Sequence, residues 1–117
     1  MRNSQLWLIG AGVAILQLLI GNVMVFYGVL PQLLGLHALL AAILLVIAVY
    51  GYVRVKVALE KRILMGNIGL IIIASIFGYL FIDFGNPVLT LIHFILALGI
   101  LSNFSVLYGI ERGKLYH

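Results

Sequence analysis

Cysteine is absent from this sequence of 117 residues, and charged side chains are scarce. Without cysteine, the chain has no disulfides, zinc–thiolate sites or iron–sulfur clusters. Charged residues make up 9% of the chain, against about 25% in a typical soluble domain. Hydrophobic residues make up 65%. This balance is typical of an integral membrane protein and leaves no room for a soluble catalytic domain.

Four uncharged apolar runs cover most of the sequence, over residues 6–27, 33–53, 63–81 and 88–108. A helix needs roughly 20 apolar residues to cross the hydrocarbon core. None of the runs alternates with a period of two, which argues against a β-barrel, and lipid then requires helices. The first run is too long for a signal peptide. We therefore predict an all-α fold, an integral membrane four-helix bundle forming a single transmembrane domain over 1–117.

The positions of lysine and arginine predict how the chain is oriented. All of them precede the first run, lie between the second and third, or follow the fourth. By the positive-inside rule, both termini and the middle connection, 54–62, are cytoplasmic in a multi-pass plasma-membrane protein. This explains the net charge of +4, so no nucleic-acid partner is expected. Glu60 in the middle connection and Asp83 in an outer one are expected to be solvated, although Asp83 is the one acidic group near the outer edge.

An internal repeat appears when the chain is shifted against itself. Residues 31–41 (PQLLGLHALLA) align with residues 87–97 (PVLTLIHFILA), sharing the pattern P-x-L-x3-H-x2-L-A. The chain has two prolines and three histidines in all, so these matches are the informative ones. The pattern predicts two parallel-repeated helical hairpins, about 1–56 and 57–117, related by a pseudo-two-fold axis along the membrane normal. Chance similarity in a biased composition is the alternative.

His37 and His93 are the candidate metal ligands. Each follows its proline by six residues, so each lies roughly 9 Å into its helix, and the two imidazoles share one depth. An ionisable group inside a span is a functional-site hypothesis by default. Zinc takes about four ligands, whereas a haem iron needs two axial ligands. We predict one haem b per chain, with iron ligated by His37 and His93. The alternative is that each histidine hydrogen-bonds a neighbouring helix.

Several neighbours of the histidines are expected to line a haem site. Ala41 and Ala97 follow the histidines by four residues, on the same helical face, and would leave room for a flat macrocycle. Phe94 and Tyr27 are the predicted aromatic contacts, with Phe26 and Leu44 as further packing, and Gln32, Asn86, Tyr27 and Thr90 are near the propionates. Other glycines and polar residues are assigned to helix packing: Gly10, Gly12, Gly21, Gly66, Gly69, Gly78, Gly99, Gln17, Asn22, Asn67, Ser75, Ser102, Asn103 and Ser105.

On these residues the chain resembles the haem A synthase family. That family is built from two similar four-helix bundles, each with a histidine in its second and fourth helices near the outer face, as His37 and His93 are placed here. Residues 16–23 (LQLLIGNV) are similar to the family's LQ-x2-LG-x-LV, and residues 37–41 (HALLA) to its H-R-x-x-A. The resemblance implies a half-size relative of one bundle that holds a haem between two histidines.

The chain departs from the family at positions that matter for catalysis. The family's first bundle carries a glutamate, implicated in oxidising the haem methyl group, three residues before histidine. Leu34 and Thr90 occupy that position here, and Ala38 and Phe94 occupy the following arginine position. The outer cysteine pair of some members is absent. Haem ligation therefore carries over to His37 and His93, whereas the hydroxylation chemistry does not.

Three functions remain open at this point, and a small four-helix transporter is a weaker fourth, since no broken helix or acidic relay is evident. The first is a b-type cytochrome that transfers electrons, because bis-histidine iron has no open position for a substrate. The second is a haem A synthase-like enzyme of haem modification, although no catalytic residue is assigned. The third is a non-haem structural or assembly subunit of a membrane complex. The expected partners are the lipid bilayer, the haem, and either a redox partner or a second copy of the chain.

Overall fold

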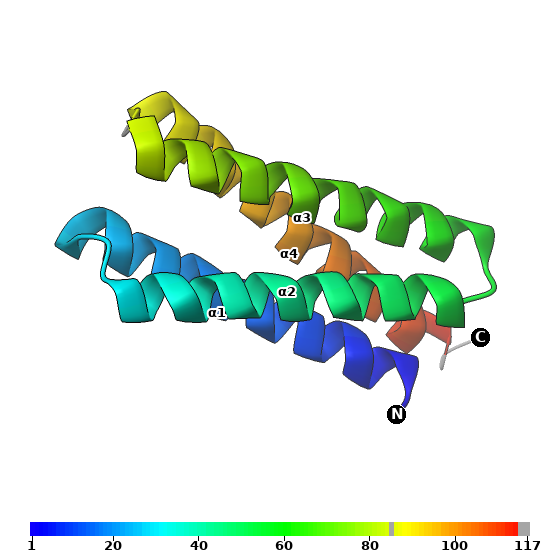
Figure 1. The fold of residues 1–117 in the computed structure, drawn as a ribbon. Coiled ribbons are helices and arrows are strands. Elements are labelled where there is room, and N and C mark those ends of the chain that lie inside the picture. The colour runs from blue at the N-terminus through cyan, green and yellow to red at the C-terminus, as the bar shows by residue number, and fades with distance from the viewer. Residues whose placement is uncertain (85, 115–117) are drawn as a thin grey trace.

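The computed structural model describes residues 1–84 and 86–114, with side chains described over 1–80 and 86–114. These residues form four helices, α1 (Asn3–Tyr27), α2 (Pro31–Arg54), α3 (Ala58–Phe84) and α4 (Pro87–Gly113). The helices run alternately up and down in an elongated bundle of 48 × 21 × 20 Å (Figure 1). All four are long and apolar enough to cross a membrane. The described chain is therefore an all-α, multi-pass membrane protein.

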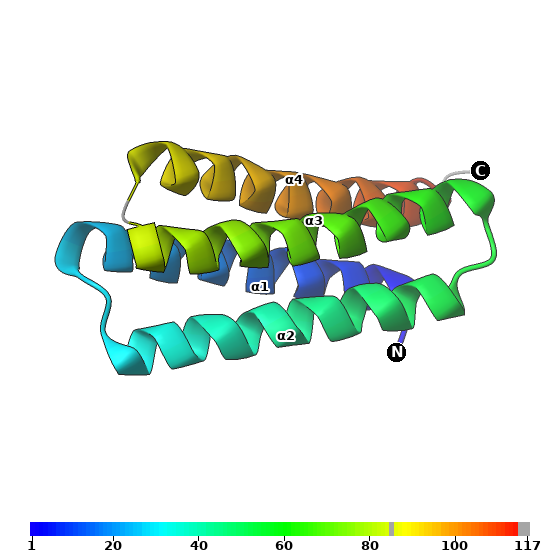
Figure 2. The same ribbon diagram turned by 45° about the horizontal axis from the view of Figure 1, so that its top comes forward.

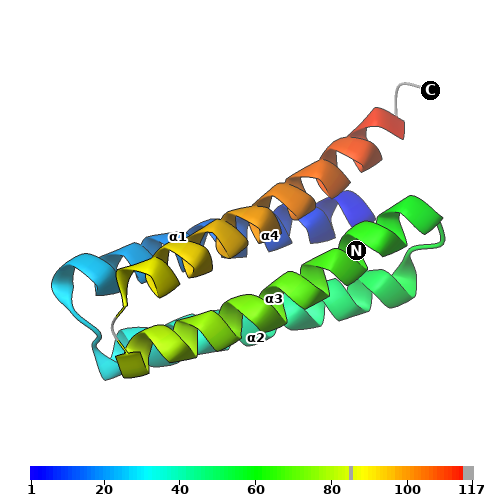
Figure 3. The ribbon, with the colours of Figure 1, turned by 90° about the horizontal axis from the view of Figure 1, so that it is seen from above.

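Each helix packs on two neighbours, so the bundle has two diagonals. α1 and α3 each contact α2 and α4, and α2 and α4 lie diagonally across the bundle (Figures 2 and 3). The start of α1, the end of α4 and the connection between α2 and α3 lie at one end, here called the terminal end (Figure 1). The other end, called the proline end, holds the starts of α2 and α4. His37 and His93 lie near the proline end.

The helix boundaries follow from local chemistry. Pro31 and Pro87 are the first residues of α2 and α4, where a missing N–H costs little. Each predicted span lies within one helix, but the middle connection is shorter than predicted. Residues 58–62 belong to α3, which leaves 55–57 as the connection. Alanine, leucine and glutamate favour helix, and an acidic side chain in the first turn interacts favourably with the helix N-terminus.

The terminal half of the bundle contains most of the packed core. Trp7 and Phe104 are fully buried there, and their rings stack with centroids 6.4 Å apart. Two glycines permit this packing: a methyl group at Gly51 would lie 2.5 Å from Trp7 Cη2, and one at Gly10 would lie 2.8 Å from Phe104 Cδ1. Gly10 was among the glycines assigned to packing from the sequence, whereas Gly51 was not. Close approach of the backbone at Gly51 lets α2 accommodate the indole of α1.

We expect Gly51→Ala to destabilise the protein, because the added methyl group overlaps the Trp7 ring. Overpacking of this kind costs about 1–3 kcal/mol, which should lower the thermal unfolding midpoint in detergent. Gly12→Ala on α1 is the matched control, since apart from the adjoining backbone and chain neighbours no described atom lies within 4 Å of its added methyl group. Alanine favours helix over glycine, so the control should be neutral or slightly stabilising. Equal midpoints for the two variants would contradict this packing.

Glu60 is buried, and the expectation that it is solvated was wrong. Its side chain is 2% exposed and accepts a hydrogen bond from Lys114 Nζ at 2.7 Å. Lys114 also donates to Glu111 at 2.8 Å. The hydrogen bonds to Glu111 and then to Glu60 raise the pKa of Lys114 above its ordinary value. Because Glu60 is in the first turn of α3, the pair joins α3 to the end of α4.

Polar side chains also join α3 to α4 within the span, as predicted for interhelical hydrogen bonds. Asn67 is fully buried; its amide donates to the carbonyl oxygen of Ile100 at 3.5 Å. Asn103 donates to Asn67 Oδ1 at 3.1 Å. Ser75 and Ser105 instead donate to carbonyl oxygens of their own helices. The two asparagines therefore stabilise the α3–α4 interface in a medium where unsatisfied polar groups are costly.

Candidate functional site

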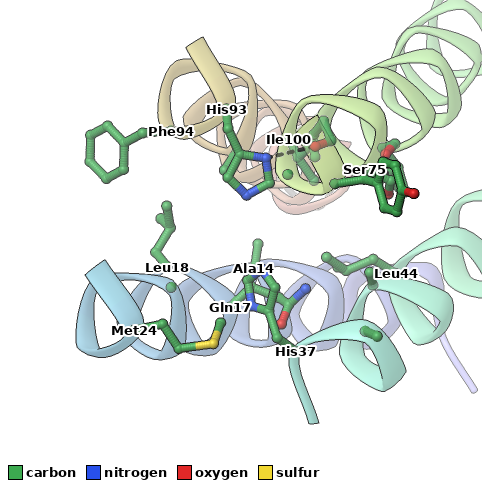
Figure 4. Close-up of a pocket in the computed structure, with 18 of the residues that line it drawn as sticks. Ala14, Gln17, Leu18, Met24, His37, Leu44, Ser75, His93, Phe94 and Ile100 are labelled. Atoms are coloured by element: carbon green, nitrogen blue, oxygen red, sulfur yellow. Dashed lines mark hydrogen bonds between the residues drawn. The ribbon is translucent and has the colours of Figure 1, made fainter. Parts of the chain in front are cut away.

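His37 and His93 face each other across the diagonal of the bundle. His37 is on α2 and His93 is on α4, and their ring centroids are 6.1 Å apart, with the ring planes at 59°. Each histidine lies six residues after the proline that begins its helix, so the two rings meet at one depth near the proline end. Figure 4 shows both rings pointing into the space between the helices. The tertiary structure thus brings the two predicted ligands together.

The His93 ring is held against α3. Its Nδ1 is 2.6 Å from the carbonyl oxygen of Ala74, drawn as a dashed line in Figure 4. A carbonyl oxygen can only accept, so Nδ1 carries the proton and Nε2 keeps its lone pair. One turn further along α3, a methyl group at Gly78 would lie 3.0 Å from His93 Cε1. The absence of a side chain at Gly78 therefore lets the imidazole pack close to α3. The hydrogen bond to Ala74 leaves Nε2 as the ring nitrogen with a free lone pair.

The His37 ring lies against α1 in a similar manner. A methyl group at Gly21 would lie 3.6 Å from His37 Cε1, which is ordinary contact distance. His37 Nδ1 is buried, and among the described residues it has no hydrogen-bond partner. A buried polar atom left unsatisfied costs about 1–3 kcal/mol. Hydrogen bonding to a neighbouring helix therefore accounts for the environment of His93 but leaves that of His37 unexplained.

A cavity of about 730 Å³ surrounds the two histidines, and all four helices line it. Of the predicted site residues, Ala41, Ala97 and Phe94 line this cavity beside the histidines, as do Leu44 and Thr90. Tyr27 does not: it is 84% exposed and, like Phe26, Gln32 and Asn86, lies outside the lining. The Asn86 side chain instead caps α4 by accepting from the Val88 N–H at 2.8 Å.

The cavity adjoins a part of α3 and α4 that is less tightly packed than the rest of the bundle. Among the described residues of 75–80 and 86–99, no side chain is fully buried, although most are apolar. Ligand sites in proteins commonly enclose about 300–1,000 Å³ with apolar walls and few polar groups. The volume and apolar lining therefore suit a large apolar ligand, with the two imidazoles as the polar groups that would orient it.

The donor set fits a metal that brings most of its own ligands. Among the described residues, no group of three or more His, Cys, Asp or Glu side chains could hold a metal ion. His37 and His93 would be the two protein ligands, since their ring centroids are 6.1 Å apart and a neutral imidazole nitrogen can bind a metal. Small side chains at Ala41 and Ala97 leave space beside the rings. The described residues thus fit an iron porphyrin.

Polar groups around the cavity are few. Thr90, Asn22, Ser75 and Tyr79 line it, together with Gln17. The side chain of Asp83, the predicted acidic group near this edge, lies outside the described residues, as does His117. Leu34 and Thr90, which stand three residues before the histidines, both line the cavity. Leu34 is apolar and Thr90 carries a neutral hydroxyl group, so neither can act as a carboxylate base.

Sequence reasoning assigned Gly21, Gly78 and Gln17 to general packing and overlooked Ala74. A usable signal was present, because residues equally distant from the turn of an antiparallel helical hairpin lie side by side. Gly21 and His37 are about equally distant from the connection between α1 and α2, and Gly78 and His93 from that between α3 and α4. The glycine opposite each histidine was therefore identifiable, whereas the carbonyl of Ala74 carries no sequence signal.

Comparison with known proteins adds no assignment to this geometry. The chain matches no protein-family model, and no curated protein and no solved structure matches it either.

Proposed function

We propose that this chain is a membrane haem protein in which His37 and His93 ligate the iron of one haem b. The observation that carries the proposal is the pair of imidazoles 6.1 Å apart inside an apolar cavity lined by all four helices. The group supplies one-electron chemistry, because its iron alternates between the ferrous and ferric states. The function that this supports best is electron transfer in the membrane, as in a b-type cytochrome.

The surroundings of His93 support ligation through its Nε2. The Ala74 carbonyl fixes the proton of His93 on Nδ1, which is the usual arrangement of a metal-bound histidine. Gly21 and Gly78 set the distance of the rings from α1 and α3. Apolar walls formed by Ala41, Ala97 and their neighbours exclude water from the ring faces. These residues bind and orient the group without supplying an acid or a base.

The lining favours electron transfer over modification of the haem. In the resemblance to the haem A synthase family, the glutamate positions correspond to Leu34 and Thr90, and both face the cavity. Leucine and threonine cannot replace a carboxylate in proton abstraction. If both histidines ligate the iron, they would leave it no open position for a substrate or oxygen. The half-size relative that we propose keeps the ligands of that family and lacks its catalytic glutamate.

The proposal also includes a location and an orientation. All seven lysine and arginine residues lie in or beside the helix ends and the connection of the terminal end. By the positive-inside rule, this end faces the cytoplasm of a plasma membrane and the histidine pair lies toward the outer side. The two hairpins, about 1–56 and 57–117, are proposed to be a parallel repeat. A redox partner, or a second copy of the chain, would then exchange electrons across the proline end.

The absorbance spectrum of detergent-purified protein, produced in haem-sufficient cells, tests the function. We expect about one haem b per chain, with a sharp Soret band and separate α and β bands on reduction, as six-coordinate low-spin iron gives. Extraction of the pigment and mass measurement would distinguish haem b from a hydroxylated or formylated haem, which would favour the modifying enzyme instead. Colourless protein that stays colourless after haem titration would refute haem binding and leave the structural subunit as the function.

A further inference from the structure

The cavity holds a second unsatisfied polar group besides His37. Gln17 on α1 is 8% exposed, and its side-chain oxygen, Oε1, is buried with no hydrogen-bond partner among the described residues. Gln17 and His37 both line the cavity, and Figure 4 shows both on the side opposite His93. An amide oxygen accepts hydrogen bonds, and an imidazole Nδ1–H donates them. The two groups are therefore chemically complementary.

The hairpin of α3 and α4 shows which group occupies the position next to His93 that Gln17 occupies next to His37. On α3, Ala74 provides the acceptor for His93 Nδ1, and Gly78, four residues later, contacts the same ring. On α1, Gln17 precedes Gly21 by four residues, and Gly21 contacts His37. Residues four apart share one face of a helix. Gln17 thus stands in the same relation to Gly21 and His37 as Ala74 stands to Gly78 and His93.

We propose that Gln17 is the positioning residue of His37, its side-chain oxygen accepting the hydrogen bond from His37 Nδ1–H. This hydrogen bond would satisfy both buried atoms and leave the lone pair of the neutral His37 ring on Nε2. The role of Nε2 as an iron ligand rests on the proposed function. The pairing of Gln17 with His37 does not, because it concerns two side chains of the chain alone.

This pairing makes the two ligands unequal. His93 is held by a main-chain carbonyl, which is fixed by its helix, whereas His37 is held by a side chain with rotatable bonds. An acceptor at Nδ1–H raises the basicity of the imidazole and orients it toward the metal. Loss of the Gln17 acceptor should therefore weaken ligation by His37 alone. Weaker donation to the iron favours the ferrous state, so the reduction potential should rise.

The test compares Gln17→Leu with Gln5→Leu, a matched substitution on α1 at an exposed position outside the cavity lining, where the side chain accepts only a capping hydrogen bond from the Arg2 N–H at 3.0 Å. In the haem-loaded protein, we expect Gln17→Leu to weaken haem binding about 10–100-fold and to raise the reduction potential, while Gln5→Leu changes neither. Unchanged affinity and potential in Gln17→Leu would overturn the proposal.

A second measurement needs no haem. In protein labelled with 15N-histidine, the ring nitrogens report the tautomer, and we expect both His37 and His93 to be protonated at Nδ1. Gln17→Leu should shift His37 toward the Nε2-protonated form and leave His93 unchanged; an unshifted His37 would contradict the pairing. If Gln17→Leu does not fold, Gln17→Glu keeps an acceptor and should retain the tautomer. The two proposals can fail separately. If the wild type binds no haem, but Gln17→Leu still shifts the His37 tautomer, the haem function is refuted and the pairing is supported.

Discussion

Replacing His37 or His93 by alanine should abolish the six-coordinate haem spectrum. Each ring supplies one of two facing imidazoles, so a single replacement leaves iron with one protein ligand. We expect haem affinity to fall at least about 100-fold, because even residues that only orient a ligand are worth 10–100-fold in metal affinity. The measurement is haem titration followed by absorbance, with circular dichroism to verify helical content.

His117→Ala is the control, since that histidine lies beyond α4 in the sequence. Imidazole added to the buffer should restore a six-coordinate spectrum to either single variant by entering the space of the deleted ring. The double variant should bind no haem at the same concentrations. Normal spectra in both single variants would show that the histidines are not the ligands. Because the hydrogen bond from His93 to Ala74 joins α3 and α4, His93→Ala should also lose about 0.6 kcal/mol of stability.

Ala97→Phe should weaken haem binding while leaving both histidines in place. Ala97 is on α4, four residues after His93, and lines the cavity. A phenyl ring there would occupy the space beside the imidazole that the porphyrin needs. Overpacking costs about 1–3 kcal/mol, which corresponds to roughly 5- to 150-fold weaker binding. Haem titration gives the dissociation constant directly.

Gly109→Phe provides a matched control on the same helix, because no described atom lies within 4 Å of a methyl group placed at Gly109. That variant should bind haem like the wild type. If Ala97→Phe bound haem with unchanged affinity, the macrocycle would lie outside the cavity. This conclusion would hold even if the histidine variants had lost haem binding. The two experiments therefore test the ligands and the cavity separately.

Hydropathy and a few marked residues were enough to predict the four helices and the shared depth of the histidines. These features depend on the local chain: lipid requires every backbone group to be bonded within the helix, and proline begins α2 and α4. The depth of each histidine in the membrane then follows from its distance in sequence from that proline and the helical rise per residue. The gathering of basic residues at one end follows from the same boundaries, because consecutive antiparallel helices return the chain to the same side.

Which face of each helix points inward could not be predicted in this way. The spans are apolar on every side, so hydropathy does not distinguish the bundle interior from lipid. Glu60 was expected in solvent because its sequence neighbours are charged, but it is buried against Lys114 at the end of α4. Its partner lies more than fifty residues away, and the rotation of α3 brings them together.

The immediate surroundings of the candidate site depend on the same rotations. Ala74 offers a main-chain oxygen, an atom that every residue has, and it becomes a partner of His93 because α3 packs on α4. In the sequence, nothing distinguishes Gln17 from the other polar residues of the spans. It lines the cavity because α1 packs against α2. Proline spacing and helical rise thus predict where along the membrane the imidazoles meet. Packing of side chains from four helices determines what holds each ring.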